Sequence, residues 1–214
     1  MLLRFAQLTL LLFLALLMVA ALLTARPVSA EPYRVAQADD SRVCATLARA
    51  AETALGIPSK LVLAVGIIES GRYDKSIGRA EPWPWTINAE GKGYRFRSKA
   101  EAVQAVEKLQ AARVRSIDVG CMQVNLSYHG DAFADLEEAF DPVMNIADGA
   151  HFLNTRRDDR GSWSKAVAAY HSSNPERGVP YRRKVAKAWI ALRAEIVEAI
   201  VAPDDSRRAR IAAA

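Results

Sequence analysis

Histidine and cysteine are scarce in this chain of 214 residues, and their scarcity excludes several kinds of site. There are three histidines and two cysteines. No H-E-x-x-H segment is present, and no two histidines lie at the helical spacing that a zinc site uses. A phosphate-binding glycine loop and a Gly-x-Ser-x-Gly segment are also missing. We therefore expect no metal site, no cofactor and no serine-hydrolase nucleophile. The histidines are His129, His151 and His171.

The sequence also lacks a strong charge of either sign. Its formal net charge is +5, from 29 Lys and Arg against 24 Asp and Glu, and the basic residues are scattered rather than grouped into a stripe. A mildly basic balance fits an anionic polymer as a partner but does not single one out. Nucleic acid is a poor candidate, because its binding needs a concentrated basic surface.

A long apolar run occurs only at the N-terminus. Arg4 precedes the almost wholly apolar segment Leu8–Leu23, and the small residues of "VSA" end at Ala30. This order predicts a secretory signal peptide, residues 1–30, and an exported protein of the periplasm or cell envelope. An uncleaved membrane anchor is the alternative, although the run is shorter than the ~20 residues that a spanning helix needs.

The rest of the chain is long enough for one domain with a real core. Residues 31–41 are polar and unpatterned and predict a linker, and residues 202–214 predict a flexible tail. We expect the domain to span residues 42–201, with no internal repeat, and to be a monomer. Apolar residues recur in it at helical spacing. The expected helices are 42–55, 58–71, 99–112, 142–156, 162–170 and 181–201.

Two stretches interrupt this helical pattern. Trp83–Phe96 has β-forming residues on both sides of a glycine-bearing turn and predicts a β-hairpin. Its aromatics can either stack on a ligand or cover the inner side of the hairpin. The segment around Gly120 predicts extended chain with a tight turn, and residues 171–180 predict a loop. The expected fold is mainly α with one small hairpin.

Glu69 is the first candidate for chemistry, because it ends the apolar helix that begins before Leu61. Burial raises the pKa of a carboxyl group, and the negative end of a helix dipole acts in the same direction. A carboxyl group that keeps its proton near neutral pH is suited to general acid catalysis at a glycosidic oxygen. The alternative is a solvated glutamate at a helix end.

Three motifs occur in a fixed order along the domain: Glu69-Ser70, Gly120-Cys121-Met122-Gln123 and Ala169-Tyr170-His171. Together with "DPVMNI", residues 141–146, they resemble the lytic transglycosylases of the lysozyme superfamily, which have a soluble-lytic-transglycosylase-like domain. The resemblance covers roughly residues 42–201 and implies a lysozyme-like helical domain. Cys121 and His171 depart from the motifs, where the family usually has leucine and asparagine.

The resemblance also implies roles for individual residues. Glu69 would be the sole catalytic acid and base, and Tyr170 would reach towards it. The other residues implied in substrate binding are Ser70, Met122, Gln123 and Asn125. From the residues alone, Met122 can equally be a core side chain and Gln123 a turn amide with its hydrogen bonds made. His171 can donate and accept hydrogen bonds, but it can also titrate.

The two cysteines, Cys44 and Cys121, can form one disulfide in an oxidising compartment. Two buried thiols are the alternative, because the sequence does not give the distance between them.

The reaction implied by the resemblance is cleavage of peptidoglycan strands between N-acetylmuramic acid and N-acetylglucosamine, with formation of 1,6-anhydromuramic acid ends. Ordinary glycosidases use two carboxylates. Asp74 and Asp118 are the only other acids near the motifs, and we expect the first outside the helix and the second as a turn-capping residue. A lysozyme-like hydrolase and a non-catalytic wall-binding module remain alternatives. General wall turnover and service to a secretion or flagellar machine remain open as well.

Overall fold

The computed structural model describes residues 40–75, 77–129 and 131–201. The predicted signal peptide and tail, and nearly all of the predicted linker, lie outside these residues. Within the described ranges, no helix is long and apolar enough to cross a membrane. The fold is mainly helical with small antiparallel sheets, so the predicted class, a lysozyme-like helical domain with a small hairpin, is confirmed.

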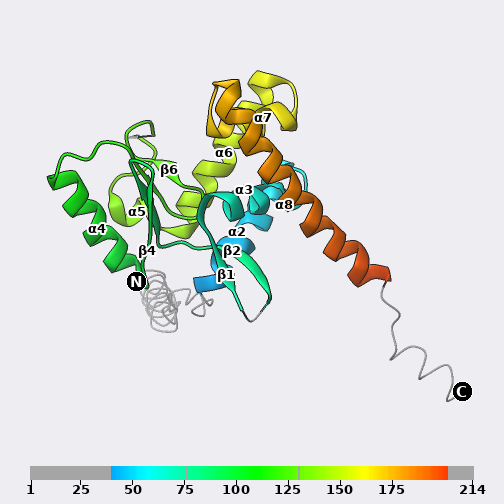
Figure 1. Ribbon diagram of the computed structural model, residues 1–214, viewed down its shortest axis with the longest axis horizontal. Coiled ribbons are helices and arrows are strands. Elements are labelled where there is room, and N and C mark those ends of the chain that lie inside the picture. The colour runs from blue at the N-terminus through cyan, green and yellow to red at the C-terminus, as the bar shows by residue number, and fades with distance from the viewer. Residues whose placement is uncertain (1–39, 76, 130, 202–214) are drawn as a thin grey trace, which may run out of the picture. The chain divides into compact units, whose positions relative to one another are not determined.

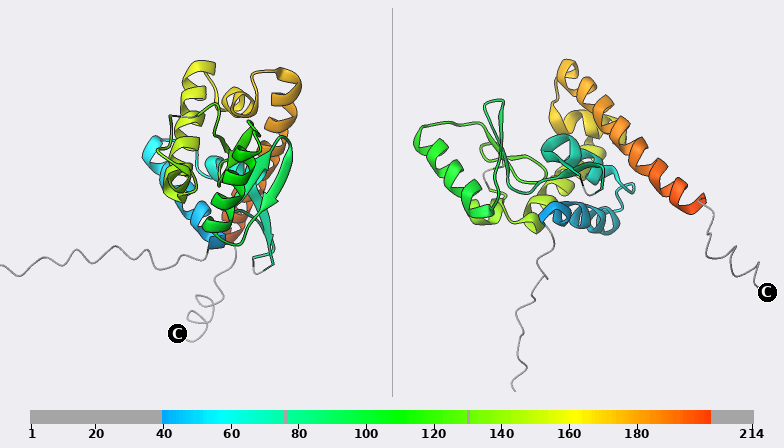
Figure 2. Two further views of the ribbon diagram at one scale, coloured as in Figure 1. Left: turned by 90° about the vertical axis from the view of Figure 1, so that its left-hand side faces the viewer. Right: turned by 60° about the horizontal axis from the view of Figure 1, so that its bottom comes forward.

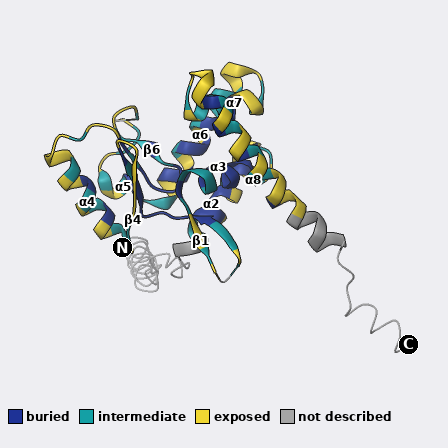
Figure 3. Cartoon of the chain, viewed as in Figure 1, coloured by how far each residue is buried: buried dark blue, intermediate teal, exposed yellow. Residues whose placement is uncertain are grey.

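Five helices pack around the larger of two hydrophobic clusters. The helix α3 lies inside this cluster, and all residues from Leu61 to Gly66 are buried (Figure 3). Its apolar side chains point in every direction, as a helix surrounded by others requires. The five helices are α2 (Asp40–Leu55), α3 (Leu61–Ser70), α6 (Pro142–Arg160), α7 (Trp163–His171) and α8 (Pro175–Val201).

A small sheet and the helix beside it enclose the second cluster. The strands are antiparallel in the order β4-β3-β5-β6, and the predicted hairpin is the pair β3–β4. In Figures 1 and 2 the sheet and α4 lie on one side of α3, and α7 and α8 lie on the other. The elements are β3 (Thr86–Ala89), β4 (Lys92–Arg95), α4 (Lys99–Ala111), β5 (Ile117–Val119), β6 (Val124–Asn125) and α5 (Leu136–Ala139).

The hairpin and the helix that follows it form as their local sequence requires. Gly91 has a φ of 86° in the turn, which glycine adopts without strain. Trp83 and Trp85, 5% and 7% exposed, cover the inner side of the hairpin. At α4 the hydroxyl of Ser98 accepts a hydrogen bond from the backbone N–H of Glu101. The Glu101 carboxylate in turn accepts one from the N–H of Arg97, close to a capping box.

The start of α3 differs from the prediction, because the helix begins at Leu61 rather than near Pro58. Lys60 has a φ of 69°, which breaks the helical path. Glu52 of α2, 4% exposed, accepts hydrogen bonds from the N–H groups of Lys60 at 2.7 Å and Leu63 at 3.1 Å. A carboxylate from a neighbouring helix therefore satisfies the N-terminus of α3.

The predicted loop over residues 171–180 is confined to residues 172–174, and the rest of the prediction is wrong, since α7 ends at His171 and α8 already begins at Pro175. The side chain of Asn174 accepts a hydrogen bond from the N–H of Glu176, and proline is favoured in the first turn of a helix. Gly178 then lets α8 approach α7 closely, because an added Cβ would lie 2.8 Å from the backbone oxygens of Ala168 and Ser172.

The sequence interpretation also missed a two-stranded ribbon directly after α3. β1 (Gly71–Asp74) pairs with β2 (Arg79–Pro82) in an antiparallel register that sets Gly71 opposite Pro82. The chain therefore turns from helix to strand immediately after Ser70. This abrupt change leaves Glu69 at the very end of a rigid helix.

Candidate active site

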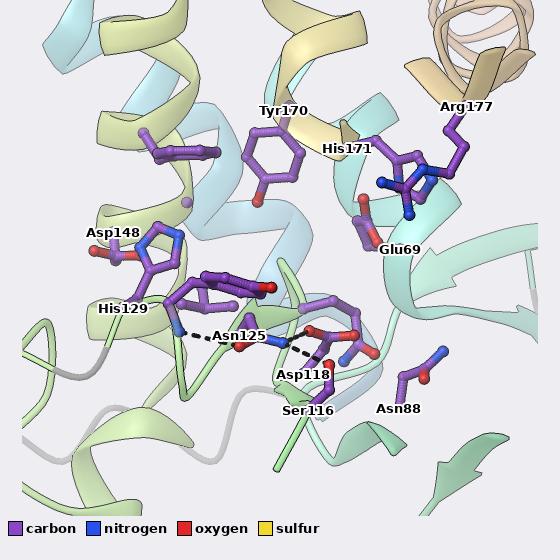
Figure 4. Close-up of a pocket in the computed structure, with 15 residues that line it drawn as sticks. Glu69, Asn88, Ser116, Asp118, Asn125, His129, Asp148, Tyr170, His171 and Arg177 are labelled. Atoms are coloured by element: carbon purple, nitrogen blue, oxygen red, sulfur yellow. Dashed lines mark hydrogen bonds and ion pairs between the residues drawn. The ribbon is translucent and has the colours of Figure 1, made fainter. Parts of the chain in front are cut away.

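A pocket of about 420 Å³ contains Glu69 and takes residues from both halves of the domain (Figure 4). Strands β3, β5 and β6 contribute one wall, and α6, α7 and the start of α8 contribute others. The lining residues are Glu69, Asn88, Ser116, Asp118, Gln123, Val124, Asn125, Tyr128, His129, Asp148, Gly149, Phe152, Tyr170, His171 and Arg177.

Glu69 combines a partly buried position with a short hydrogen bond. Its Oε1 accepts from the hydroxyl of Tyr181 at 2.6 Å. Burial raises the pKa of Glu69 to about 7, the Tyr181 hydrogen bond lowers it in part, and the negative charge of Asp118 raises it further. Near neutral pH this group is therefore divided between acid and carboxylate, as a group that both gives and takes a proton requires.

Asp118 lies in the same pocket, and the expectation that it caps a turn is wrong. It belongs to β5, directly opposite Asn125 of β6, whose amide donates to its Oδ1 at 2.7 Å. Burial raises the pKa of Asp118, while the Asn125 hydrogen bond and His171 lower it. Asp74 lies in β1 and does not line the pocket. Of the two aspartates considered from the sequence, Asp118 is thus the second carboxyl of the site.

The motif from Gly120 to Gln123 forms a tight turn against the end of α3. Ser70 is fully buried, and its hydroxyl donates to the backbone oxygen of Cys121 at 2.7 Å. Gln123 lines the pocket with a φ of 50°, and its amide donates to the oxygens of Thr86 and Gly120. Gln123 therefore fixes the turn with the same side chain that borders the pocket.

Two predicted substrate-binding residues do not line the pocket. Met122 is fully buried, and its side chain packs where a Cβ on Gly149 would lie. Ser70 is also absent from the pocket wall. Gln123, Asn125 and Tyr170 do line it.

Asn145 holds the same turn from the side of α6 and is completely buried. Its Oδ1 accepts from the N–H of Met122 at 2.9 Å, and its Nδ2 donates to the oxygens of Val119 and Ala139, each at 3.0 Å. Gly120 has a φ of 81°, and a Cβ there would overlap the Asn145 amide. The sequence interpretation named the segment 141–146 but missed this role.

Two tyrosines lie beside Glu69 in different ways. The hydroxyl of Tyr170 donates to the backbone oxygen of Met122 at 2.9 Å, so its hydrogen bond goes to the turn rather than to Glu69. Tyr181, from α8, makes the contact with Glu69 that the resemblance led us to expect of Tyr170. Burial, together with the charge of Glu69, keeps the pKa of both phenols well above the usual value.

His171 borders the pocket and supports Tyr181. The two rings are stacked, with centroids 4.5 Å apart and an interplanar angle of 6°. Burial lowers the pKa of His171, Arg177 and Lys184 lower it further, and Asp118 opposes them. The imidazole is therefore neutral at pH 7. Among the described residues, no three His, Cys, Asp or Glu side chains gather as a metal site would require.

A disulfide joins α2 to the turn of the pocket. Cys44 Sγ and Cys121 Sγ are 2.10 Å apart, and 77 residues separate the two positions in sequence. The cysteine that departs from the family motif at 121 is thus one end of this bond.

The three motifs, brought together at one pocket, can be compared with known families. The sequence profile of the transglycosylase SLT domain matches residues 46–178, more than half of the chain. The chain belongs to this family. The match begins in α2 and ends in the first turn of α8, so it includes Glu69, the turn and Tyr170. No curated protein and no solved structure matches the chain significantly.

Proposed function

We propose that this member of the SLT family is an exported lytic transglycosylase, which cleaves peptidoglycan between N-acetylmuramic acid and N-acetylglucosamine. The observation that carries the proposal is the state and position of Glu69. This carboxyl group has a pKa of about 7, stands at the end of helix α3 and lines a pocket of about 420 Å³. Family membership supplies the reaction class.

Glu69 acts first as the acid. The Tyr181 hydroxyl donates to Oε1, so the carboxyl proton is carried on Oε2. Oε2 gives this proton to the glycosidic oxygen as the bond to C1 of the muramyl ring breaks. N-acetylglucosamine leaves with a free C4 hydroxyl, and positive charge develops at C1.

Glu69 then acts as the base. As a carboxylate it takes the proton of the muramyl C6 hydroxyl while that oxygen bonds to C1. The product is a 1,6-anhydro ring, Glu69 recovers its proton, and no water is consumed. The C6 hydroxyl is part of the same sugar, and a well-oriented intramolecular group has an effective concentration of up to ~10⁵ M or more.

Asp118 favours a second candidate, a lysozyme-like hydrolase on the same fold. It faces the same pocket as Glu69 and could position water as the second carboxylate of an ordinary glycosidase. The amide of Asn125 already donates to its Oδ1, which occupies one of its two carboxylate oxygens. A non-catalytic wall-binding module would not require a carboxyl group with a pKa of about 7, as Glu69 has.

The proposal extends to the rest of the chain. Residues 1–30 would be a signal peptide, 31–41 a linker, 42–201 the catalytic domain and 202–214 a tail. The Cys44–Cys121 disulfide and the family fit a place outside the cytoplasm, in the periplasm or cell envelope. Glycan strands are the partner, and the protein acts as a monomer.

Mass spectrometry of the sugars released from purified peptidoglycan tests the proposal. We expect 1,6-anhydromuramic ends, each lighter by one water than a hydrolytic end. Asp118→Asn and Asp74→Asn should leave the product type unchanged. Reducing muramic acid ends that disappear in Asp118→Asn would establish the hydrolase instead.

A further inference from the structure

An apolar groove of about 230 Å³ lies between α7 and α8, which run side by side in Figure 1. None of the described residues lines both this groove and the pocket of Glu69. The pocket uses the end of α7 and the start of α8, whereas the groove uses the start of α7 and later turns of α8. A molecule bound in the groove would therefore leave the pocket open. The groove is lined by Leu61, Trp163, Ser164, Val167, Arg182, Val185, Ala186, Trp189 and Ile190.

The lining residues follow the helical repeat on both helices. On α8 they lie at positions 182, 185, 186, 189 and 190, and on α7 at 163, 164 and 167. Residues at these spacings share one face of a helix. From 182 to 190 the stripe on α8 is about 12 Å long, at about 1.5 Å per residue. A groove between two such helical faces fits a third helix with apolar side chains at i, i+4 and i+7.

The apolar side chains of the groove are fixed in place but not covered. The indole Nε1 of Trp189 donates to the backbone oxygen of Ser59 at 2.8 Å, which holds the ring. Ile190 is nevertheless 67% exposed in the groove wall. Apolar patches that stay exposed, with tryptophan among them, are typical of protein-binding surfaces.

Positive charge borders the groove. Of the described residues that line it, Arg182 alone is charged. The guanidinium groups of Arg157 and Arg193 lie over the two tryptophan rings of the groove, 5.8 Å and 5.3 Å from the ring centroids. Among the side chains of α8 that the structure describes, six are basic and one is acidic. At the end of α6, three arginines accompany two aspartates. The surface around the groove is thus basic.

This charge distinguishes between the possible occupants. A second copy of the chain, bound through the same face, would place these cations against one another. The C-terminal segment 202–214 has three arginines and two aspartates, so it offers no surplus of acid. A helix with acidic flanks would instead place carboxylates beside the arginines, and charge complementarity of this kind sets the choice of partner.

We propose that the groove between α7 and α8 binds an amphipathic helix of another protein, whose apolar side chains fill the groove and whose acidic side chains pair with Arg157, Arg182 and Arg193. The inference goes beyond the proposed function and does not depend on it. It gives the domain a second surface, through which a partner would hold the protein without closing the pocket of Glu69.

NMR titration of the exported protein with two synthetic helical peptides tests the proposal. The probe has leucine at helical spacing and glutamate on its flanks, and its counterpart has lysine in place of each glutamate. We expect the glutamate peptide, and not the lysine peptide, to shift the indole N–H signals of Trp163 and Trp189. Ile190→Asp should weaken binding of the glutamate peptide at least tenfold, because it removes an apolar contact from the groove. Arg182→Glu should reverse the preference between the two peptides.

Val143→Asp is the matched control, because Val143 is also apolar and 55% exposed but lies at the start of α6 outside the groove. It should bind both peptides as the parent does. Equal binding of the two peptides, no shift at the two indole signals, or an equal loss in Val143→Asp would overturn the proposal. So would two other results. A dimer of the parent that Ile190→Asp dissociates in sedimentation would assign the groove to a second copy, and tighter peptide binding by Ile211→Asp would assign it to the C-terminal segment.

Discussion

Removing the hydroxyl of Tyr181 should move the pH dependence of the enzyme in a known direction. In Tyr181→Phe, Glu69 loses the 2.6 Å hydrogen bond that stabilises its carboxylate form. Hydrogen bonds to charged groups contribute about 1.5–3 kcal/mol, and one pKa unit corresponds to about 1.4 kcal/mol. The pKa of Glu69, about 7 in the native protein, should therefore rise by about one to two units.

The assay is kcat/KM for solubilisation of purified peptidoglycan, measured from acid to alkaline pH. Activity needs the protonated form of Glu69, so it should fall as pH rises through the pKa of this group. We expect that fall near pH 7 in the parent and at about pH 8–9 in Tyr181→Phe. Tyr73→Phe, a surface change on β1, should leave the fall in activity near pH 7. A fall that stays near pH 7, or moves to lower pH, in Tyr181→Phe would refute the assignment of this hydrogen bond to Glu69.

Three further changes test the site and its support. Glu69→Gln should reduce activity ~100-fold or more. Because the pKa of Glu69 in the folded protein, about 7, lies above the usual 4.5 of a glutamate, its protonated form contributes stability that is fully present below pH 4.5 and is lost as pH rises through 7. Glu69→Gln should thus be more stable than the parent by about 3 kcal/mol at alkaline pH and equal in acid, measured by urea unfolding. Cys44→Ser with Cys121→Ser should cost about 4 kcal/mol, and thiol titration of the denatured parent should find no free thiol. Gly120→Ala should cost more than about 2 kcal/mol in thermal unfolding, and an unchanged melting temperature would contradict the tight fit.

The parts of the fold that could be predicted from the sequence are those that local chemistry determines. Ser98 and Glu101 mark the start of α4, and the glycines after β3 mark the hairpin turn. The β1–β2 ribbon could not be predicted in this way, because it depends on pairing between two short polar segments. The start of α3 likewise depends on Glu52, which belongs to another helix.

The candidate site shows the same division. Glu69 could be predicted, because an acid that ends an apolar helix is a local pattern. Tyr181 could not, since 112 residues separate it from Glu69 and nothing nearby distinguishes it from other helix tyrosines. Asp118 resembles a turn residue until β5 and β6 pair and set it opposite Asn125.

The contact between Gly120 and Asn145 has a consequence for how this sequence can vary. A side chain at 120 would occupy the space of the Asn145 amide, and loss of that amide would leave the backbone of Met122, Val119 and Ala139 without its hydrogen bonds. Neither position can change alone without cost, although they lie 25 residues apart. In a library randomised at both positions, functional clones should therefore keep glycine at 120 and asparagine at 145 together. Clones that keep only one of the two residues should be rare.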